Sequence, residues 1–265
     1  MTRDTLITPV LTIDGETALV RQDMLAVEEP LEIRIGGVAI SITMRTPGHD
    51  LDLAAGFLLT EGIVEAADEI VSLHSGESGN SVLVELKKDL GPESERYRRN
   101  FYATSSCGIC GKASIAAIET LPRRPMPTGS PRVQPATIHR LPDMLREAQP
   151  VFERTGGLHA AALFSADGHL LALREDIGRH NALDKLIGHA LRQAPALLDD
   201  SLVLVSGRAG FELVQKCVMA GIPILAAVGA PSSLAVETAR RFGLTLAGFV
   251  RGNKFNIYSG RERIL

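Results

Sequence analysis

Residues 202–228 read LVLVSGRAGFELVQKCVMAGIPILAAV, and the fold class follows from this stretch. Its two ends, 202–206 and 224–228, are apolar runs of strand length, which indicates buried strands. Between them, residues 210–221 have the length of a helix and end at Gly221, a residue that commonly closes helices. A strand, a helix and a second strand predict a βαβ crossover, and therefore a parallel sheet covered by helices.

The alternation of strands and helices continues on both sides of this unit. The further elements that we expect are strands at 159–164 and 169–174, helices at 181–192 and 233–243, a strand at 244–250 and an edge strand at 255–258. Ala166-Asp-Gly168 is a hairpin signal between the first two strands. The second half of the chain is therefore expected to be a three-layer α/β/α sandwich.

The first hundred residues predict a smaller α+β unit. Residues 31–35 and 38–44 alternate apolar and polar side chains around Gly36-Gly37, as in a β-hairpin. Residues 51–62 read as a helix that ends at Gly62, preceded by a turn ending at Asp50 that can cap it. Two more strands are expected at 70–73 and 82–86.

A proline-rich segment separates the two halves. Its prolines are Pro122, Pro125, Pro127, Pro131 and Pro135. This density excludes a regular element, because proline has no N–H and breaks helices and strands. A helix is expected to begin at Leu141 and to end at Thr155-Gly-Gly157. We therefore expect an α+β unit at 1–100, a mobile cysteine loop and linker at 101–137, and an α/β domain at 138–265.

The composition argues against several classes of function. A net charge of −3 gives no reason to expect nucleic-acid binding, and there is no apolar run of about 18 residues that would predict a membrane span. From the first residues given we expect no signal peptide. Three cysteines, two of them in one pair, do not make a disulfide framework and fit a reducing compartment. We expect a soluble cytoplasmic protein.

The cysteine pair is Cys107-Gly-Ile-Cys110, with Lys112 close by to favour a thiolate. It could be half of a zinc site, but no second pair of ligands lies nearby. It could be a thioredoxin-like redox pair, but the preceding segment is a poor core strand. The functional interpretation is a nucleophilic thiolate that accepts and hands on a group, with the second cysteine assisting or resolving. Cys217 lies on an apolar helix face and reads as a core residue.

Loops that follow strands of the second half favour an anionic ligand. Ser206-Gly207-Arg208 stands between a strand and a helix N-terminus, where free N–H groups attract phosphate. Gly229-Ala-Pro-Ser-Ser233 repeats this geometry one βα unit later, and such loops share one crevice in a doubly wound sheet. Either loop alone would be explained by turn chemistry and helix capping.

Two polar segments complete the candidate site. Glu175-Asp-Ile-Gly-Arg-His-Asn181 precedes a helix, so Asp176, Arg179, His180 and Asn181 either face a ligand or cap the helix. Phe249-Val-Arg-Gly-Asn-Lys254 ends a core strand with two cations around a glycine. Arg251 and Lys254 can hold phosphate, and the alternative is a solvated turn.

Taken together, these pieces resemble the FdhD/NarQ family of sulfur carrier proteins required for formate dehydrogenase activity. The matching motifs are Cys107-Gly-Ile-Cys-Gly111, Thr155-Gly-Gly-Leu-His-Ala-Ala161, Glu175-Asp-Ile-Gly-Arg-His-Asn-Ala-Leu-Asp-Lys185, Ser206-Gly-Arg-Ala-Gly-Phe-Glu212 and Phe249-Val-Arg-Gly-Asn-Lys-Phe-Asn-Ile-Tyr258. The cysteine motif alone is weak evidence, whereas the ordered set covers nearly the whole chain and is highly specific.

The resemblance implies a second domain similar in fold to cytidine deaminases. It also implies that a cysteine desulfurase loads sulfur as a persulfide on Cys107, with Cys110 beside it. The sulfur then passes to the molybdenum of a bis(molybdopterin guanine dinucleotide) cofactor before this cofactor enters formate dehydrogenase. The cofactor is a bound client, with no permanent cofactor or metal, and family members are homodimers. The family's cofactor-binding stretch matches Phe249, Val250, Arg251, Gly252, Asn253 and Lys254.

Other functions stay open beside this one. The chain could be a molybdenum-cofactor chaperone or guanine-nucleotide-binding module without sulfur transfer, or a metal-binding structural protein. As a sulfurtransferase-type carrier it would not be a multiple-turnover metabolic enzyme. Hydrolytic deamination is not expected, because His159-Ala-Ala161 has alanine where zinc deaminases need glutamate and no Pro-Cys pair follows.

Overall fold

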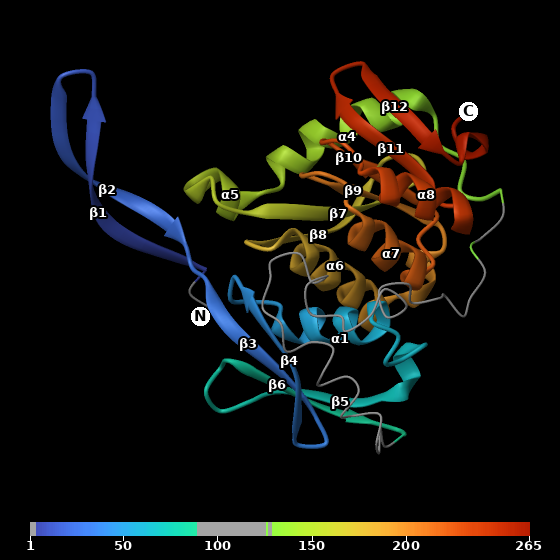
Figure 1. Cartoon of the computed structure of the whole chain (residues 1–265), viewed down its shortest axis with the longest axis horizontal. Coiled ribbons are helices and arrows are strands. Elements are labelled where there is room, and N and C mark those ends of the chain that lie inside the picture. The colour runs from blue at the N-terminus through green and yellow to red at the C-terminus, as the bar shows by residue number, and fades with distance from the viewer. Residues whose placement is uncertain (1–3, 89–125, 127–128) are drawn as a thin grey trace.

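The computed structural model describes residues 4–88, 126 and 129–265. Within them the chain forms a six-stranded sheet, a four-stranded sheet and a two-stranded arm (Figure 1). The fold is α/β, with a small N-terminal α+β unit and a C-terminal domain that has helices on both faces of its sheet. The predicted fold class is therefore confirmed.

The six-stranded sheet forms the centre of the C-terminal domain. Its strands, in spatial order, are β12 (Lys254–Ser259), β11 (Thr245–Arg251), β10 (Ile224–Ala227), β9 (Ser201–Val205), β7 (His159–Ser165) and β8 (Leu170–Asp176). The three strands β9, β10 and β11 are parallel, as the crossover pattern predicts. The remaining pairs of neighbouring strands are antiparallel. Strand β12 pairs with β11, β7 pairs with β9, and β8 pairs with β7.

Helices cover the two faces of this sheet. They are α6 (Arg179–Gln193), α7 (Phe211–Ala220) and α8 (Ser233–Phe242) on one face, and α4 (Pro135–Glu147) on the other, followed by α5 (Pro150–Thr155). Helix α7 ends where the sequence predicts, because Gly221 takes a left-handed conformation with φ of 75°. Short 3₁₀ turns lie at η1 (Ala67–Glu69), η3 (Pro195–Leu198) and η4 (Arg261–Arg263).

The expected helix that begins at Leu141 is wrong in both its start and its extent. Helix α4 begins at Pro135, where the ring fixes φ and the missing N–H has no helical partner to lose. The helix tolerates Pro142 in its interior and ends before Gln149, and α5 is a separate short helix. The expected linker at 101–137 therefore overlaps the first turn of α4.

The N-terminal sheet has the order β4-β3-β6-β5. Its strands are β3 (Glu29–Ile35), β4 (Val38–Arg45), β5 (Ile70–Ser75) and β6 (Ser81–Leu86). Helix α1 (Asp50–Thr60) lies between this sheet and α6 (Figure 1). Asp50 was expected to cap α1, but the capping position falls on His49, and the Asp50 carboxylate accepts hydrogen bonds from Arg45.

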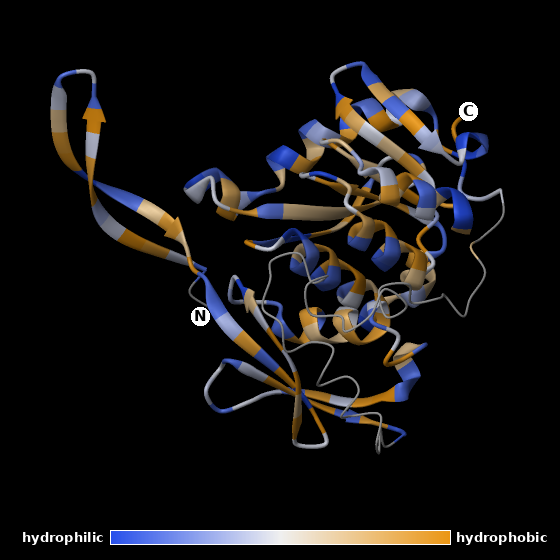
Figure 2. Cartoon of the chain, in the orientation of Figure 1, coloured by the Kyte–Doolittle hydropathy of each residue, from blue (hydrophilic) through white to orange (hydrophobic). Residues whose placement is uncertain are grey.

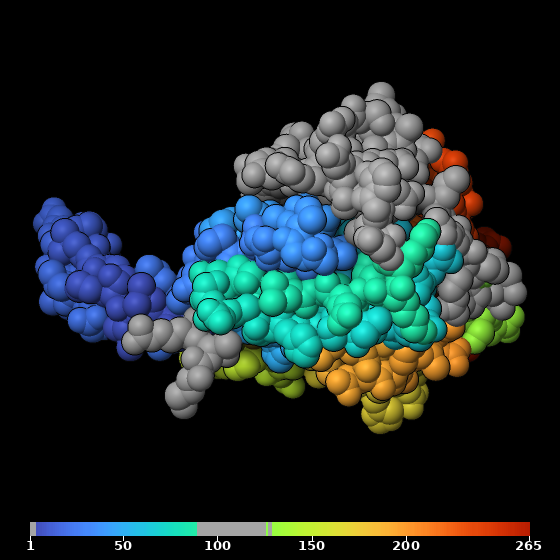
Figure 3. All heavy atoms as spheres, turned by 90° about the horizontal axis from the view of Figure 1, so that it is seen from below, coloured from blue at the N-terminus to red at the C-terminus, as the bar shows by residue number. Residues whose placement is uncertain are grey.

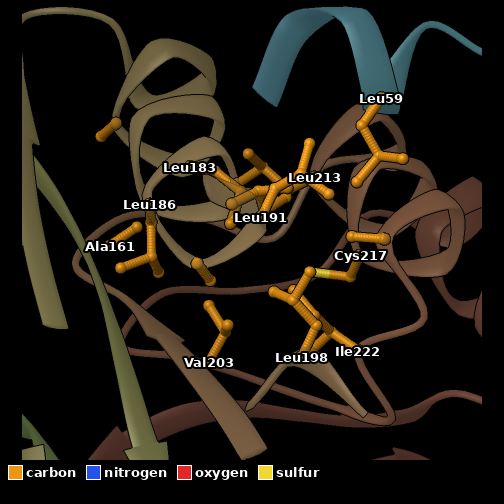
Figure 4. Packing of buried hydrophobic residues seen from close by; sticks show 14 of the residues in the cluster. Leu59, Ala161, Leu183, Leu186, Leu191, Leu198, Val203, Leu213, Cys217 and Ile222 are labelled. Carbon is orange, nitrogen blue, oxygen red and sulfur yellow. The ribbon is translucent and has the colours of Figure 1, made fainter. Parts of the chain in front are cut away.

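The two units share one hydrophobic core. Leu31 and Ile33 of the N-terminal sheet belong to the same cluster of buried side chains as Val203 and Leu225 of the six-stranded sheet. Figure 4 shows the middle of this cluster, where Leu59 of α1 lies near Cys217 of α7. The packing therefore runs without interruption from one sheet to the other.

A two-stranded arm projects from the body of the molecule (Figures 1 and 3). It consists of β1 (Thr5–Asp14) and β2 (Thr17–Ala26), which pair antiparallel over their whole length. Hydrophobic and hydrophilic positions alternate along it (Figure 2). Leu11 and Val20, which are opposite each other in the register, remain 63% and 67% exposed.

Candidate functional site

Three predicted loops meet at one edge of the six-stranded sheet. Gly229 follows β10 and Gly207 follows β9. The N–H of Gly229 donates a hydrogen bond to the carbonyl oxygen of Gly207 at 3.0 Å. The Phe249 N–H, near the end of β11, donates to the Gly229 carbonyl at 3.0 Å. The structure thus brings Ser206-Gly207-Arg208, Gly229 and Phe249 together, because parallel strands present their carboxyl ends at the same edge.

The glycines at this edge permit the close approach of the loops. A Cβ atom on Gly229 would lie 2.9 Å from the Gly207 carbonyl oxygen and 3.1 Å from Cα of Arg208. Both contacts involve backbone atoms, which cannot move aside as a flexible side chain can. The Ser206 Oγ accepts a hydrogen bond from the Ala160 N–H at 2.9 Å, which ties the loop to strand β7.

The predicted stretch Phe249–Lys254 spans the end of β11, the turn at residues 252–253 and the first residue of β12. Val250 is fully buried, and Phe249 has an unusual positive φ of 55° for a residue other than glycine. Arg251 and Lys254 are opposite each other in the register and are exposed, as are Gly252 and Asn253. Neither cation forms an ion pair with another residue that the structure describes, so both charges remain available to an anion.

A cavity of about 410 Å³ opens beside these loops. Its walls come from α4 and α5, from residues 156–159, and from Ser206 and Val228. Gln149, between the two helices, is 4% exposed, and its Nε2 has no hydrogen-bond partner among the described residues. The guanidinium of Arg146 lies 4.3 Å from the ring centre of Phe152 on this wall. The cavity is therefore mainly apolar, with a few polar groups.

His159 is the titratable side chain that joins the cavity to the glycine loops. It lines the cavity, and a Cβ atom on Gly207 would lie 3.4 Å from its Nδ1. Burial lowers the pKa of His159 below its ordinary value, and the charges of Arg179 and His180 lower it further. The imidazole is therefore neutral near pH 7 and can both donate and accept a hydrogen bond.

The polar segment 175–181 divides between two roles. The Asp176 carboxylate is fully buried, lies 2.7 Å from Nζ of Lys185, and accepts from the Thr46 N–H at 3.1 Å. Asn181 donates to the Met44 carbonyl at 2.7 Å. These two side chains hold α6 against β4 through hydrogen bonds and an ion pair within the protein.

The other members of that segment lie toward the sheet edge. Nε2 of His180 lies 2.8 Å from Oε2 of Glu212, which joins the first turns of α6 and α7. Arg179 contributes positive charge near His159. The ligand-facing interpretation is therefore retained for Arg179 and His180, and the structural one describes Asp176 and Asn181.

The chain matches the FdhD/NarQ family over residues 26–265. It belongs to this family. A sulfur carrier protein FdhD from Mycolicibacterium paratuberculosis is 53% identical over 255 residues, which cover 93% of this chain and 94% of the relative. Another from Streptomyces coelicolor is 50% identical over 264 residues, covering 96% and 94%. Among solved structures, a formate dehydrogenase accessory protein from Desulfotalea psychrophila matches with a TM-score of 0.78 and 25% identity, covering 98% of this chain and 99% of that one.

The family's cysteine motif falls outside the described residues. Cys107 and Cys110 lie in the segment 89–125, so their role remains a prediction. Cys217 is fully buried in the shared core, as expected, and burial raises the pKa of its thiol. Within the described part of the chain, no group of three His, Cys, Asp or Glu side chains is placed to hold a metal ion. No described helix is long and apolar enough to cross a membrane.

Gln149, Arg146 and Phe152 were not predicted as site residues. The sequence predicted all three inside one long helix, where polar side chains are normally solvated. The signal that could have found them is Gln149-Pro150, because a residue before proline is driven out of the helical conformation. At this break Gln149 has φ of −104° and ψ of 73°, and the residue lines the cavity.

Proposed function

We propose that this chain is a sulfur carrier that serves formate dehydrogenase. The observation that carries the proposal is the 50–53% identity, over nearly the whole chain, to relatives that are named sulfur carrier protein FdhD. The Cys107-Gly-Ile-Cys110 pair supports it, since a sulfur carrier needs a thiolate that is flanked by small residues and accessible to a donor. The reducing cytoplasm would keep both thiols available.

In the first step, the Cys107 thiolate attacks the terminal sulfur of a persulfide on a cysteine desulfurase. A new S–S bond forms on Cys107, and the desulfurase cysteine leaves as a thiolate. Delivery of this sulfur as sulfide consumes two electrons. A Cys110 thiolate supplies them when it attacks Sγ of Cys107, which forms a disulfide and releases hydrosulfide. Lys112 would favour the anionic form of both sulfur species.

The acceptor in this proposal is the molybdenum of a bis(molybdopterin guanine dinucleotide) cofactor, bound as a client. The backbone N–H groups of Gly207 and Arg208 and the cations Arg208, Arg251 and Lys254 would hold its diphosphate and guanine nucleotide parts. Support comes from the loops that meet at the sheet edge and from the exposed charges of Arg251 and Lys254. The carrier would work as a homodimer, which sedimentation of the full chain tests.

Loading is tested by incubating the protein with a cysteine desulfurase and cysteine and measuring the intact mass. We expect an increment of one sulfur atom on the wild type and on Cys217→Ala, because Cys217 is buried away from any donor. Cys107→Ala should show no increment. A wild type that never gains sulfur, or a Cys107→Ala variant that gains as much, would exclude Cys107 as the carrier.

A cofactor chaperone without sulfur transfer is the second candidate function. It is favoured by the fact that the segments that meet at the sheet edge, 206–208, 229 and 249, contain no cysteine and contact one another directly. The two functions separate in cells that lack the native gene. Formate dehydrogenase activity restored in full by the Cys107→Ala chain would favour the chaperone, and its loss would favour the carrier.

A further inference from the structure

The two-stranded arm has one face that carries no charged side chain. In an antiparallel pair, opposed residues lie on the same face, and successive residues of a strand alternate between the faces. By this register, the charged side chains of β1 and β2, which are Asp14, Arg21 and Asp23, all lie on one face. The opposite face, called the neutral face below, consists of Thr5, Ile7, Pro9, Leu11, Ile13, Ala18, Val20, Gln22, Met24 and Ala26.

The neutral face is mostly apolar and is exposed to solvent. Ile7 is 62% exposed, Leu11 and Ile13 are 63% exposed, and Val20 is 67% exposed. An apolar strand face of this length is an aggregation hazard on a chain that stays alone. A two-stranded ribbon is also only marginally stable when it packs on nothing. Both arguments indicate that another surface covers the neutral face.

The body of the same chain does not supply this cover. Only Val27 and Glu28 separate β2 from β3, so the arm continues almost directly into the N-terminal sheet. The Val27 N–H donates to the Asp4 carbonyl at 2.9 Å, and the Asp4 carboxylate lies 3.4 Å from the guanidinium of Arg154 in α5. These contacts fix the base of the arm, while its length projects away from the body (Figures 1 and 3).

The chemistry of the neutral face favours a second copy of this chain as the cover. A face without charges has no electrostatic preference for an acidic or a basic partner, and it can be buried without leaving a charge unpaired. The interfaces of homodimers are more apolar than other interfaces, and their cores are depleted of charged residues in the same way. A second copy is also present wherever the chain is made, and always at the same concentration.

The area of the neutral face determines how two copies meet. Strands of ten residues are about 34 Å long and a pair of them is about 10 Å wide, so one face covers roughly 340 Å². Two neutral faces packed on each other would bury roughly 700 Å², which is less than the roughly 1,200 Å² of a stable interface. If each neutral face packs on the body of the other copy, roughly 1,400 Å² is buried, which is of standard size. Two-fold symmetry produces this reciprocal contact.

The outer face of the N-terminal sheet is a surface that fits the neutral face. It is the face turned away from the core, and Ile42 and Met44 of β4 and Leu83 of β6 lie on it, each 44–46% exposed. On β3, between these two strands, Glu32 and Arg34 neutralise each other in an ion pair of 2.7 Å. An apolar strand face can therefore pack on this sheet in the usual face-to-face manner of two sheets.

We propose that two copies of this chain dimerise by exchanging arms, so that each neutral face packs on the outer face of the partner's N-terminal sheet. The inference rests on the proposed function for the homodimer, and it adds the two surfaces that form it. Neither surface contains a residue that the proposed function uses in sulfur transfer or cofactor binding. Dimerisation and sulfur loading can therefore be measured separately.

Sedimentation equilibrium of the full chain over a range of concentrations tests the proposal. We expect the wild type to be a dimer, and Val20→Asp to raise the dissociation constant about 100-fold or more, because each dimer would bury two unpaired carboxylates. Ile42→Asp should weaken the dimer to a similar extent. Leu19→Asp is the matched control, since Leu19 is the neighbouring residue, is equally exposed at 67%, and lies on the face with Arg21 and Asp23. It should dimerise like the wild type.

The possible outcomes distinguish the arm from the homodimer and from sulfur transfer. A dimer that Val20→Asp leaves intact, or that Leu19→Asp weakens equally, overturns the neutral face as the interface while the homodimer stands. A dimer that Ile42→Asp leaves intact overturns the exchange onto the N-terminal sheet. A wild type that is monomeric overturns both the proposal and the homodimer, and association only after a cysteine desulfurase is added would assign the face to that enzyme.

Sulfur loading provides the independent readout. Val20→Asp, Ile42→Asp and Leu19→Asp should each gain one sulfur atom from a cysteine desulfurase and cysteine, as the wild type does, and thermal unfolding verifies that each variant folds. A wild type that dimerises through the arm but gains no sulfur would refute the carrier function and leave the arm exchange in place.

Discussion

Asp176 and Asn181 show that polar residues before a helix can have a structural role where the sequence also allows a ligand site. A run of polar residues before a helix predicts either a ligand site or a cap, and the sequence alone does not separate them. In the structure, Asp176 pairs with Lys185 and accepts from the backbone of Thr46, while Asn181 binds the carbonyl of Met44. These partners are at least 130 residues away along the chain or buried in α6, so no local pattern could reveal them.

His159 should make the stability of the protein depend on pH. Its pKa is lowered from 6.5, first by burial and then by Arg179 and His180. As the pH falls through 6.5, the unfolded chain takes up a proton that the folded chain still refuses, so the folded state loses stability. We expect the free energy of unfolding to fall more between pH 7.5 and 5.5 for the wild type than for His159→Gln.

Urea denaturation at the two pH values measures this difference. His49 and His189 also have lowered pKa values, but both are present in the wild type and in the variant. Their contributions therefore cancel in the comparison. Equal losses of stability in the two proteins would show that His159 titrates normally in the folded chain.

At the scale of elements, the helices and strands of the βα units were predicted closely. Gly221 and Gly243 end α7 and α8 in left-handed conformations, which a sequence pattern recognises because few other residues adopt them. The boundary of α4 was not predicted, since the run of prolines before it concealed that Pro135 starts a helix. The cavity beside α4 was missed because the break between α4 and α5 at Gln149-Pro150 was not recognised.

Helices α1 and α6 approach so closely that only glycine fits at the crossing. A Cβ atom on Gly188 of α6 would overlap the backbone of Asp52 in α1, and one on Gly56 would overlap the backbone of Asp184. Gly188→Ala should therefore force the two helices apart and lower the free energy of unfolding by about 1–3 kcal/mol. Chemical denaturation measures this loss.

Gly157→Ala is the control for that substitution. A Cβ atom there would make contacts of 3.5 Å or more, which are ordinary van der Waals distances. Its effect on stability should stay within about 0.5 kcal/mol. A Gly188→Ala variant as stable as Gly157→Ala would mean that the helices can separate at no cost.

At the scale of the molecule, the sequence indicated two units but did not show how they join or that an arm leaves the body. Apolar and polar side chains alternate along residues 5–26, as they do in strands. The same alternation occurs in a strand that packs on a core and in one that is surrounded by solvent. On the arm, Ile7, Leu11, Ile13 and Val20 share one face by their register, and all are more than 60% exposed. Only the path of the chain in space distinguishes the two cases.

The shared core predicts that the two units unfold together. A buried polar cluster also joins them, since Nζ of Lys216 in α7 lies 2.8 Å from Asp184 in α6 and 3.0 Å from Thr60 in α1. Lys216→Met would leave the Asp184 carboxylate buried without its counter-charge, which costs about 3–5 kcal/mol. Because the cluster spans both units, this loss should appear in each of them.

Hydrogen exchange in increasing urea, analysed by mass spectrometry, tests this coupling. Peptides from β3 and from β9 should lose protection at the same urea concentration in the wild type, and Lys216→Met should shift both by the same amount. The double variant Lys216→Met with Asp184→Leu should recover much of the loss, since an apolar pair replaces the ion pair. If β3 opens first and Lys216→Met moves only β9, the N-terminal unit is an independent folding domain, because a continuous core cannot open at one end alone.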